Sequence, residues 1–342
     1  MVSVEAAAIR APDDAPRRRR RGGGGREGER AMVPPATFTS YYGRPVVKAS
    51  PWEKDIPAYF FLGGLAAGSS LLAAGADLRR LPKLRRAARI AALAGGAAGT
   101  AALIHDLGRP ARFLNMLRTA KPTSPMSMGT WVLAAFGPAA SLAGAAEIAA
   151  MLRLQVPVAS RLLEVGARPA GLLAAALAPA LASYTGVLLS DTATPAWHAA
   201  GRELPFVFAA SAAASAGGLA MVTTRVDQAA PARRMAAGGA VIALAMERRM
   251  ERSMGLSAET LHHGKAQPLM DASRALTAAG TLGTVVFGRR SRAGAALSGA
   301  ALVAGSVCTR FAIFESGQAS ARDPRYTVIP QRERLERGMH LP

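Results

Sequence analysis

Two short polar motifs contain the side chains best suited to chemistry in this sequence. The first is His105-Asp106-Leu107-Gly108-Arg109-Pro110, with Arg112 close behind it, and the second is Tyr184-Thr185-Gly186. A histidine titrates near neutral pH, so His105 could transfer protons, and Asp106 or another nearby carboxylate could orient its ring. The hydroxyl groups of Tyr184 and Tyr59 could hydrogen-bond a buried carbonyl oxygen. These residue types favour proton transfer and hydrogen bonding beside an apolar interior.

Long apolar segments position these residues. Eight are predicted, at residues 56–77, 87–104, 128–152, 170–190, 204–223, 235–247, 276–288 and 293–314. A helix needs about 17–25 residues to span the hydrocarbon core of a bilayer. The sixth and seventh segments are shorter, and they span only if the flanking arginine side chains extend to the interface. We therefore expect an all-α integral membrane protein with eight transmembrane helices.

The composition supports a membrane protein. Of the 342 residues 50% are hydrophobic and 5% aromatic, and the formal charge of +20 clusters between long uncharged blocks rather than along the whole chain. This distribution argues against a nucleic-acid-binding protein and against a disordered chain. Cys308 is the only cysteine, and the histidines other than His105 fall in predicted loops or in the tail. We therefore expect no haem, no iron–sulfur cluster and no metal site in this chain.

The chain divides into three predicted parts. Residues 1–50 form an Arg/Gly/Pro-rich tail that we expect to be disordered, residues 51–315 an eight-helix transmembrane domain, and residues 316–342 a polar C-terminal tail. Loops 1–2, 3–4, 5–6 and 7–8 carry 15 basic residues against 10 in the other loops. The positive-inside rule then predicts that both termini are extracytoplasmic. Trp131 and Trp197 are expected to anchor helices at the membrane interface.

The candidate residues all fall at one end of the predicted helices. Asp55 and Tyr59 begin the first, the His105 motif ends the second, Thr130 lies near the start of the third, and Tyr184 lies near the end of the fourth. Starts of odd helices and ends of even helices share one side of the membrane. Ionisable groups at membrane depth are costly and indicate function, although helix caps, interfacial anchors and loop salt bridges would give a similar pattern.

Several of these motifs, in this order, resemble one family of membrane subunits. The sequence is similar to the polysulfide reductase membrane-subunit family (NrfD/PsrC-like), most of all to the actinobacterial branch found beside formate-dehydrogenase-like molybdoenzymes. The similarity covers about residue 39 to the C-terminus. It rests on Tyr41-Tyr42-Gly43-Arg44-Pro45, Trp52-Glu53 with Asp55-Ile56-Pro57-Ala58-Tyr59, residues 105–110 with Arg112-Phe113, residues 122–131, residues 184–189, and residues 322–326 with 330–332.

The resemblance implies a quinone-reactive anchor without haem, built from two four-helix bundles in the cell membrane. It implies menaquinone or menaquinol near the extracytoplasmic face, a four-cluster ferredoxin-like iron–sulfur subunit, a molybdopterin catalytic subunit, and contact with lipid but not nucleic acid. His105, Asp106 and Tyr184 are its candidate catalytic residues. The candidate quinone-binding residues are Asp55, Tyr59, His105, Arg109, Arg112, Thr130 and Tyr184. Some members have His or Asn in the first helix, where this chain has Asp55 and Tyr59.

Two other functions fit the same sequence features. A secondary transporter would also be polytopic and rich in small residues, but it predicts a polar site at mid-membrane and often an inverted repeat. A non-catalytic anchor or assembly subunit would keep the same partners and bind no quinone. In the quinone-reactive subunit that the resemblance implies, Arg109 and Arg112 could stabilise a semiquinone anion or hold the carboxylates of a partner.

Overall fold

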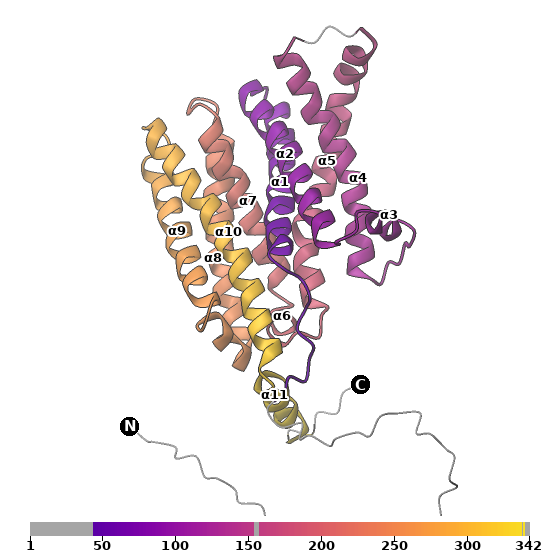
Figure 1. Ribbon diagram of the computed structural model, residues 1–342. Helices are drawn as coiled ribbons and strands as arrows, with labels where there is room; N and C mark the ends of the chain where they lie inside the picture. Colours follow the sequence, from indigo (N-terminus) through magenta and orange to yellow (C-terminus); the bar gives the residue numbers. More distant parts are fainter. Residues whose placement is uncertain (1–43, 154–156, 337, 339–342) are drawn as a thin grey trace, which may run out of the picture. The chain divides into compact units, whose positions relative to one another are not determined.

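The computed structural model describes residues 44–153, 157–336 and 338, although nothing is described of the side chains of residues 157–162 and 164 (Figure 1). Helices account for all the regular secondary structure within this part of the chain. Most of the predicted N-terminal tail and part of the first family motif lie outside the described residues. The boundaries proposed for the three parts of the chain therefore stay a prediction.

The described part of the chain contains eight helices of 20 residues or more: α1 (Asp55–Leu78), α2 (Pro82–Asp106), α4 (Pro125–Met151), α5 (Pro157–Ser190), α7 (Leu204–Thr223), α8 (Ala230–Ser253), α9 (Ala266–Val286) and α10 (Arg292–Arg322). Shorter helices lie between and after them, namely α3 (Arg112–Met116), α6 (Pro195–Ala199), the 3₁₀ helix η1 (Gly255–Leu261) and α11 (Arg325–Glu336). This is the helical arrangement drawn in Figure 1.

Six of the long helices are apolar and long enough to cross a membrane. They are α1, α2, α4, α7, α10 and residues Val165–Ser190 of α5. Helices α8 and α9 have sufficient length but not sufficient apolar character: α8 begins and ends in arginines, and α9 carries Asp271 and Arg274 near its start. The chain is thus a multi-pass membrane protein with six clear candidate spans among the described residues, and the predicted count of eight is not confirmed.

The long helices contact one another in two sets. Helix α1 packs on α2 and α5, and α4 packs on α2 and α5; in the second set α7 packs on α8 and α10, and α9 packs on α8 and α10. Helices α1 and α7 join the sets at a close crossing, where a Cβ atom on Gly68 would lie 2.7 Å from the carbonyl oxygen of Ala212. Small residues therefore bring these backbones together, as they do in other membrane helix pairs.

Two helix boundaries differ from the expectation. Helix α2 begins at Pro82 rather than near residue 87, so Arg85 and Arg86, which were expected in the preceding loop, lie in its first two turns. Proline suits the first position of a helix because it lacks only an N–H group that has no helical partner there. Helix α10 continues to Arg322, eight residues beyond the predicted end at Phe314, and its last turns bury Gln318 and Ser320.

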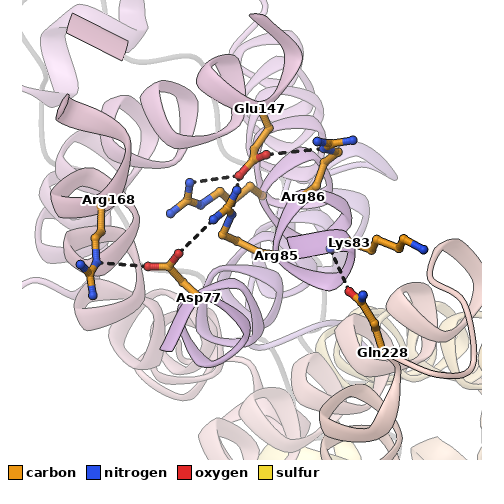
Figure 2. A network of polar contacts seen from close by, with 8 residues as sticks. Asp77, Lys83, Arg85, Arg86, Glu147, Arg168 and Gln228 are labelled. Atoms are coloured by element: carbon orange, nitrogen blue, oxygen red, sulfur yellow. Dashed lines mark hydrogen bonds and ion pairs between the residues drawn. The ribbon is translucent and has the colours of Figure 1, made fainter. Parts of the chain in front are cut away.

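An ion-pair network holds together one end of α1, α2, α4 and α5 (Figure 2). Glu147 of α4 is buried and lies 2.7 Å from Arg85 Nε, 3.6 Å from Arg86 Nε and 3.1 Å from Arg89 Nη1. Asp77 of α1 pairs with Arg85 and also reaches α5 through a contact to Arg168 Nε. One carboxylate thus pairs with three α2 arginines at the end of the helix set opposite the His105 motif.

Replacing Glu147 with glutamine should destabilise this end of the protein. The amide keeps the size of the side chain but removes the charge, which leaves buried Arg89 without its ion pair. Loss of one partner of a buried pair costs roughly 3 kcal/mol, and this should appear in thermal or SDS-induced unfolding of the purified protein. E259Q, at an exposed pair with Arg325, is the control and should leave unfolding unchanged; equal behaviour of the two variants would contradict the role given to Glu147.

Candidate functional site

A cavity of about 170 Å³ opens between the ends of α1, α2, α4 and α5, with α3 along one side. Its walls are mostly apolar. Four polar side chains converge on it: Tyr59, Asp106, Thr130 and Tyr184. An apolar pocket with a few convergent polar groups is the usual form of a small-molecule site. A larger and more open depression of about 580 Å³ lies between α6, η1 and α11, but its wide mouth gives less enclosure for a ligand.

The two tyrosines meet across the cavity. The hydroxyl groups of Tyr59 on α1 and Tyr184 on α5 are hydrogen-bonded to each other. Tyr59 is 3% exposed, whereas Tyr184 is only partly buried. The ring of Tyr184 fits against Gly129 of α4, where a Cβ atom would lie 2.1 Å from Tyr184 Cε2. Any side chain at position 129 would therefore displace the tyrosine that faces the cavity.

His105 and Asp55 form a pair beside the cavity but outside its lining. His105 Nδ1 lies 2.6 Å from Asp55 Oδ2, which joins the end of α2 to the start of α1. The His105 side chain is 82% exposed and that of Asp55 is 35% exposed. The carboxylate that orients the ring is thus Asp55, and the imidazole lies where it can exchange protons with solvent.

Asp106 and Thr130 face the cavity from opposite helices. The Asp106 carboxylate accepts a hydrogen bond from the backbone of Glu53, just before α1. The Thr130 hydroxyl donates to the carbonyl oxygen of Met126 at 2.9 Å, so that only its acceptor lone pairs remain for a ligand. Asp106 follows His105 directly in the chain, and this adjacency brings the solvent-exposed imidazole next to the cavity wall.

The two arginines of the first motif do not line the cavity. Arg109 and Arg112 follow a turn in which Gly108 has a φ of +67°, the left-handed conformation that favours glycine after a helix. Arg112 Nη1 donates to the carbonyl oxygen of Leu107 at 3.0 Å and so stabilises this turn. The structure therefore brings six of the eight candidate residues to the cavity or its edge, and it leaves Arg109 in the exposed turn and Arg112 at the exposed start of α3.

An aromatic row behind the cavity was not evident from the sequence. Trp52 lines the cavity and stacks on Trp197, with ring centroids 6.0 Å apart, and Trp197 also packs on Phe314. Trp197 is 1% exposed and donates its indole N–H to the carbonyl oxygen of Ile313 at 2.8 Å. The expectation that Trp197 is an interface anchor is therefore wrong, because its partners come from α10, distant in sequence. Trp131 is 44% exposed, as an interface residue would be.

The segment before α1 is also fixed to α10. Gln318 Nε2 donates to the carbonyl oxygens of Ser50 at 3.0 Å and Trp52 at 3.4 Å. The neighbouring Gly317 leaves room for the indole of Trp197, since a Cβ atom there would lie 2.0 Å from it. The cavity wall at Trp52 therefore depends on the last turns of α10.

The tyrosine pair yields a prediction about stability. In Y59F or Y184F one buried hydroxyl loses its partner, which should cost about 1–3 kcal/mol of unfolding free energy. The double variant removes both hydroxyls and leaves neither without a partner. Its free energy of unfolding should therefore be no lower than that of the less stable single variant. Thermal unfolding in detergent measures all four proteins, and additive losses in the double variant would show that the two hydroxyls act independently.

The part of the chain that contains the cavity matches one known protein family. The family model described as "Polysulphide reductase, NrfD" matches residues 46–253, which include every side chain that lines the cavity. A search of curated proteins found no match.

Proposed function

Since the chain belongs to the polysulphide reductase NrfD family, we propose that its cavity binds a membrane quinone and that the chain exchanges electrons between the quinone pool and a partner iron–sulfur subunit. Membership of this family indicates a membrane subunit of a quinone-linked oxidoreductase. The observation that carries the proposal is the pair Tyr59 and Tyr184, whose hydroxyls meet in an otherwise apolar cavity.

The cavity fits a quinone head group. Its volume of about 170 Å³ is below the roughly 300–1,000 Å³ of sites that enclose a whole drug-sized ligand. A flat ring would therefore lie inside, and an isoprenoid tail would extend between the helices into lipid. Phe60 and Phe113 offer apolar surface to the ring from α1 and α3. A menaquinone ring suits these walls, and we take menaquinone as the proposed ligand.

When bound, a quinone supplies two-electron, two-proton redox chemistry. The chain contributes binding and proton transfer. The hydroxyl of Tyr59 or Tyr184 can donate to a ligand carbonyl if the pair opens, and Thr130 has only acceptor lone pairs to offer. His105, held by Asp55 and exposed to solvent, can pass protons to Asp106, which faces the cavity. In this arrangement His105 and Asp106 transfer the proton, and the Tyr184 hydroxyl orients a carbonyl group of the ligand.

The placement in the membrane and the partners belong to the same proposal. We place α8 and α9 across the cell membrane with the six apolar helices, which gives two four-helix bundles supported by the two sets of contacts. The charge of the loops then puts the termini and the cavity on the extracytoplasmic side. A four-cluster iron–sulfur subunit would dock there, with Arg109 and Arg112 available for its carboxylates, and would connect to a molybdopterin subunit of formate-dehydrogenase-like type.

Purification from native membranes in mild detergent tests this proposal. We expect an iron–sulfur protein, a molybdoenzyme and near-stoichiometric menaquinone to accompany the wild-type chain. Y184F should retain the same proteins but lose most of the quinone, because the hydroxyl that binds the carbonyl is absent. A chain isolated without redox partners or quinone would contradict the proposal and favour the transporter.

Replacing His105 separates proton transfer from assembly. H105A should lower quinone turnover by at least tenfold, since removal of a general acid–base group costs about 10²–10⁴-fold in the step that it catalyses. The complex should still assemble, because the His105 side chain is largely exposed. H263A removes another exposed histidine, far from the cavity lining, and should keep full turnover. Wild-type turnover in H105A would remove this residue from the mechanism.

A further inference from the structure

Two buried ionisable side chains lie in the second helix set, outside the cavity. Glu247 of α8 is 3% exposed and Arg310 of α10 is 1% exposed. Glu247 Oε2 has no hydrogen-bond partner among the described residues, nor do Arg310 Nε and Nη1. Buried charged groups with incomplete partners are expensive in any protein and more so within a membrane. Their presence indicates a role beyond packing.

The bonds of Glu247 differ from those of the other buried glutamates. Its Oε1 atom receives a weak hydrogen bond of 3.4 Å from the Thr309 hydroxyl, which in turn lies 2.6 Å from the hydroxyl of Ser273. Glu203 is buried to the same degree but accepts from Ser253 at 2.9 Å and from Arg249. An anionic Glu247 is therefore poorly stabilised by direct contacts, and adding a proton to it removes that cost.

Arg310 is the buried cation of this region. Its Nη2 atom donates to the carbonyl oxygen of Phe208 at 2.7 Å, and its guanidinium lies 3.8 Å from the centroid of the Phe208 ring. The ring of Phe208 packs in turn on Phe60, which lines the cavity. The rings of Phe208 and Phe60 thus lie between the Arg310 guanidinium and the cavity.

Glu251 and His262 are the residues that could form a polar route from Glu247 to the surface. Glu251 lies one turn further along α8, on the same face of the helix. Its carboxylate is hydrogen-bonded to Arg274 of α9, and its Oε1 atom lies 3.1 Å from Nε2 of His262. The His262 side chain is 49% exposed. Solvent can therefore reach this route at the connection between α8 and α9.

Besides Arg274 and Arg310, helices α9 and α10 carry Asp271, Arg292, Cys308, Glu315 and Arg322. The other elements packed on α8 are α7, η1 and α1, and each titratable group in them has another partner. Helix α7 has no such group between Leu204 and Thr223, and the η1 residue Glu259 pairs with Arg325. Helix α1 contributes three titratable groups, and each is bonded to another residue. Asp55 pairs with His105, Tyr59 with Tyr184, and Asp77 with Arg85 and Arg168. The groups that act on Glu247 are therefore Arg274, Arg310 and Glu251.

We propose that Glu247 is a proton-binding site, loaded from solvent through His262 and Glu251. The proton adds to the Glu247 carboxylate and forms a neutral carboxylic acid, so that the net charge of Glu247 and Arg310 together changes from zero to +1. No electron moves in this step. A proton taken up here compensates negative charge that arrives at the cavity; this coupling rests on the proposed function, whereas the proton site itself does not.

Infrared difference spectroscopy of the purified full chain tests the proton site without any quinone. The wild type should show the C=O stretching band of a protonated carboxylic acid that titrates with pH and shifts when H₂O is replaced by D₂O. E247Q should lose this band, and E203Q, the control at an equally buried glutamate, should keep it. Survival of the band in E247Q, or its absence from the wild type, would overturn the proposal.

Two further variants test the proton site and its route without relying on E247Q alone. E247D should keep the band at a changed frequency, because the shorter acid meets different neighbours; an unchanged frequency would show that the band arises elsewhere. E251Q should slow the exchange of the band into D₂O at least tenfold, and an unchanged exchange rate would exclude the proposed route. A wild-type preparation that has the band but binds no added menaquinone would contradict the proposed function and support the proton site alone.

Discussion

The interior of a bilayer contains almost no water, and this constraint decides where polar groups can lie in the protein. A buried donor or acceptor that lacks a partner within the chain is therefore costly. At one end of the first helix set, Glu147 meets three arginines and Asp77 meets two. At the other end, two tyrosine hydroxyls satisfy each other inside the cavity. The first helix set thus has a network of ion pairs at one end and a cavity with a tyrosine pair at the other.

Three buried glutamates show how local partners give the same residue type different roles. Glu147 is surrounded by cations and Glu203 has a hydroxyl and a guanidinium, so both are stabilised as anions. Glu247 receives one long hydrogen bond from a threonine. Burial is nearly equal for the three residues, so burial alone does not separate a structural carboxylate from one that exchanges a proton. The hydrogen-bond and ion-pair partners separate the two kinds of carboxylate, and these partners come from other parts of the chain.

Much of the architecture followed from the sequence because membrane spans leave a strong local signal. All eight predicted segments are helical in the structure, and the two that lack spanning character, α8 and α9, are the ones whose predicted apolar stretches were short. The start of α2 was placed too late because its first turns carry arginines that resemble a loop. Glu147 and Asp77, from other helices, pair with those arginines, and a single sequence does not show such pairs.

The sequence predicts where the candidate residues gather, but it predicts fewer of the contacts that they make. The polar motifs indicated one end of four helices, and Tyr59, Asp106, Thr130 and Tyr184 do meet there. The pairing of His105 with Asp55 and the burial of Trp197 depend on residues far away in the chain. Gly129 gave no signal of its own, since its importance lies in the ring that fits against it. Contacts between helices decide such details, and a single sequence does not encode them locally.

The two sides of the cavity differ in how firmly they are held. Trp52 is stacked on a buried indole and its preceding segment is bonded to Gln318, so this side can move only together with the end of α10. Helix α3, which supplies Phe113 and Met116 to the opposite side, buries none of its own residues. We therefore expect the cavity to open more easily at α3, and the residence time of any molecule bound there would depend on that short helix more than on the tryptophan wall.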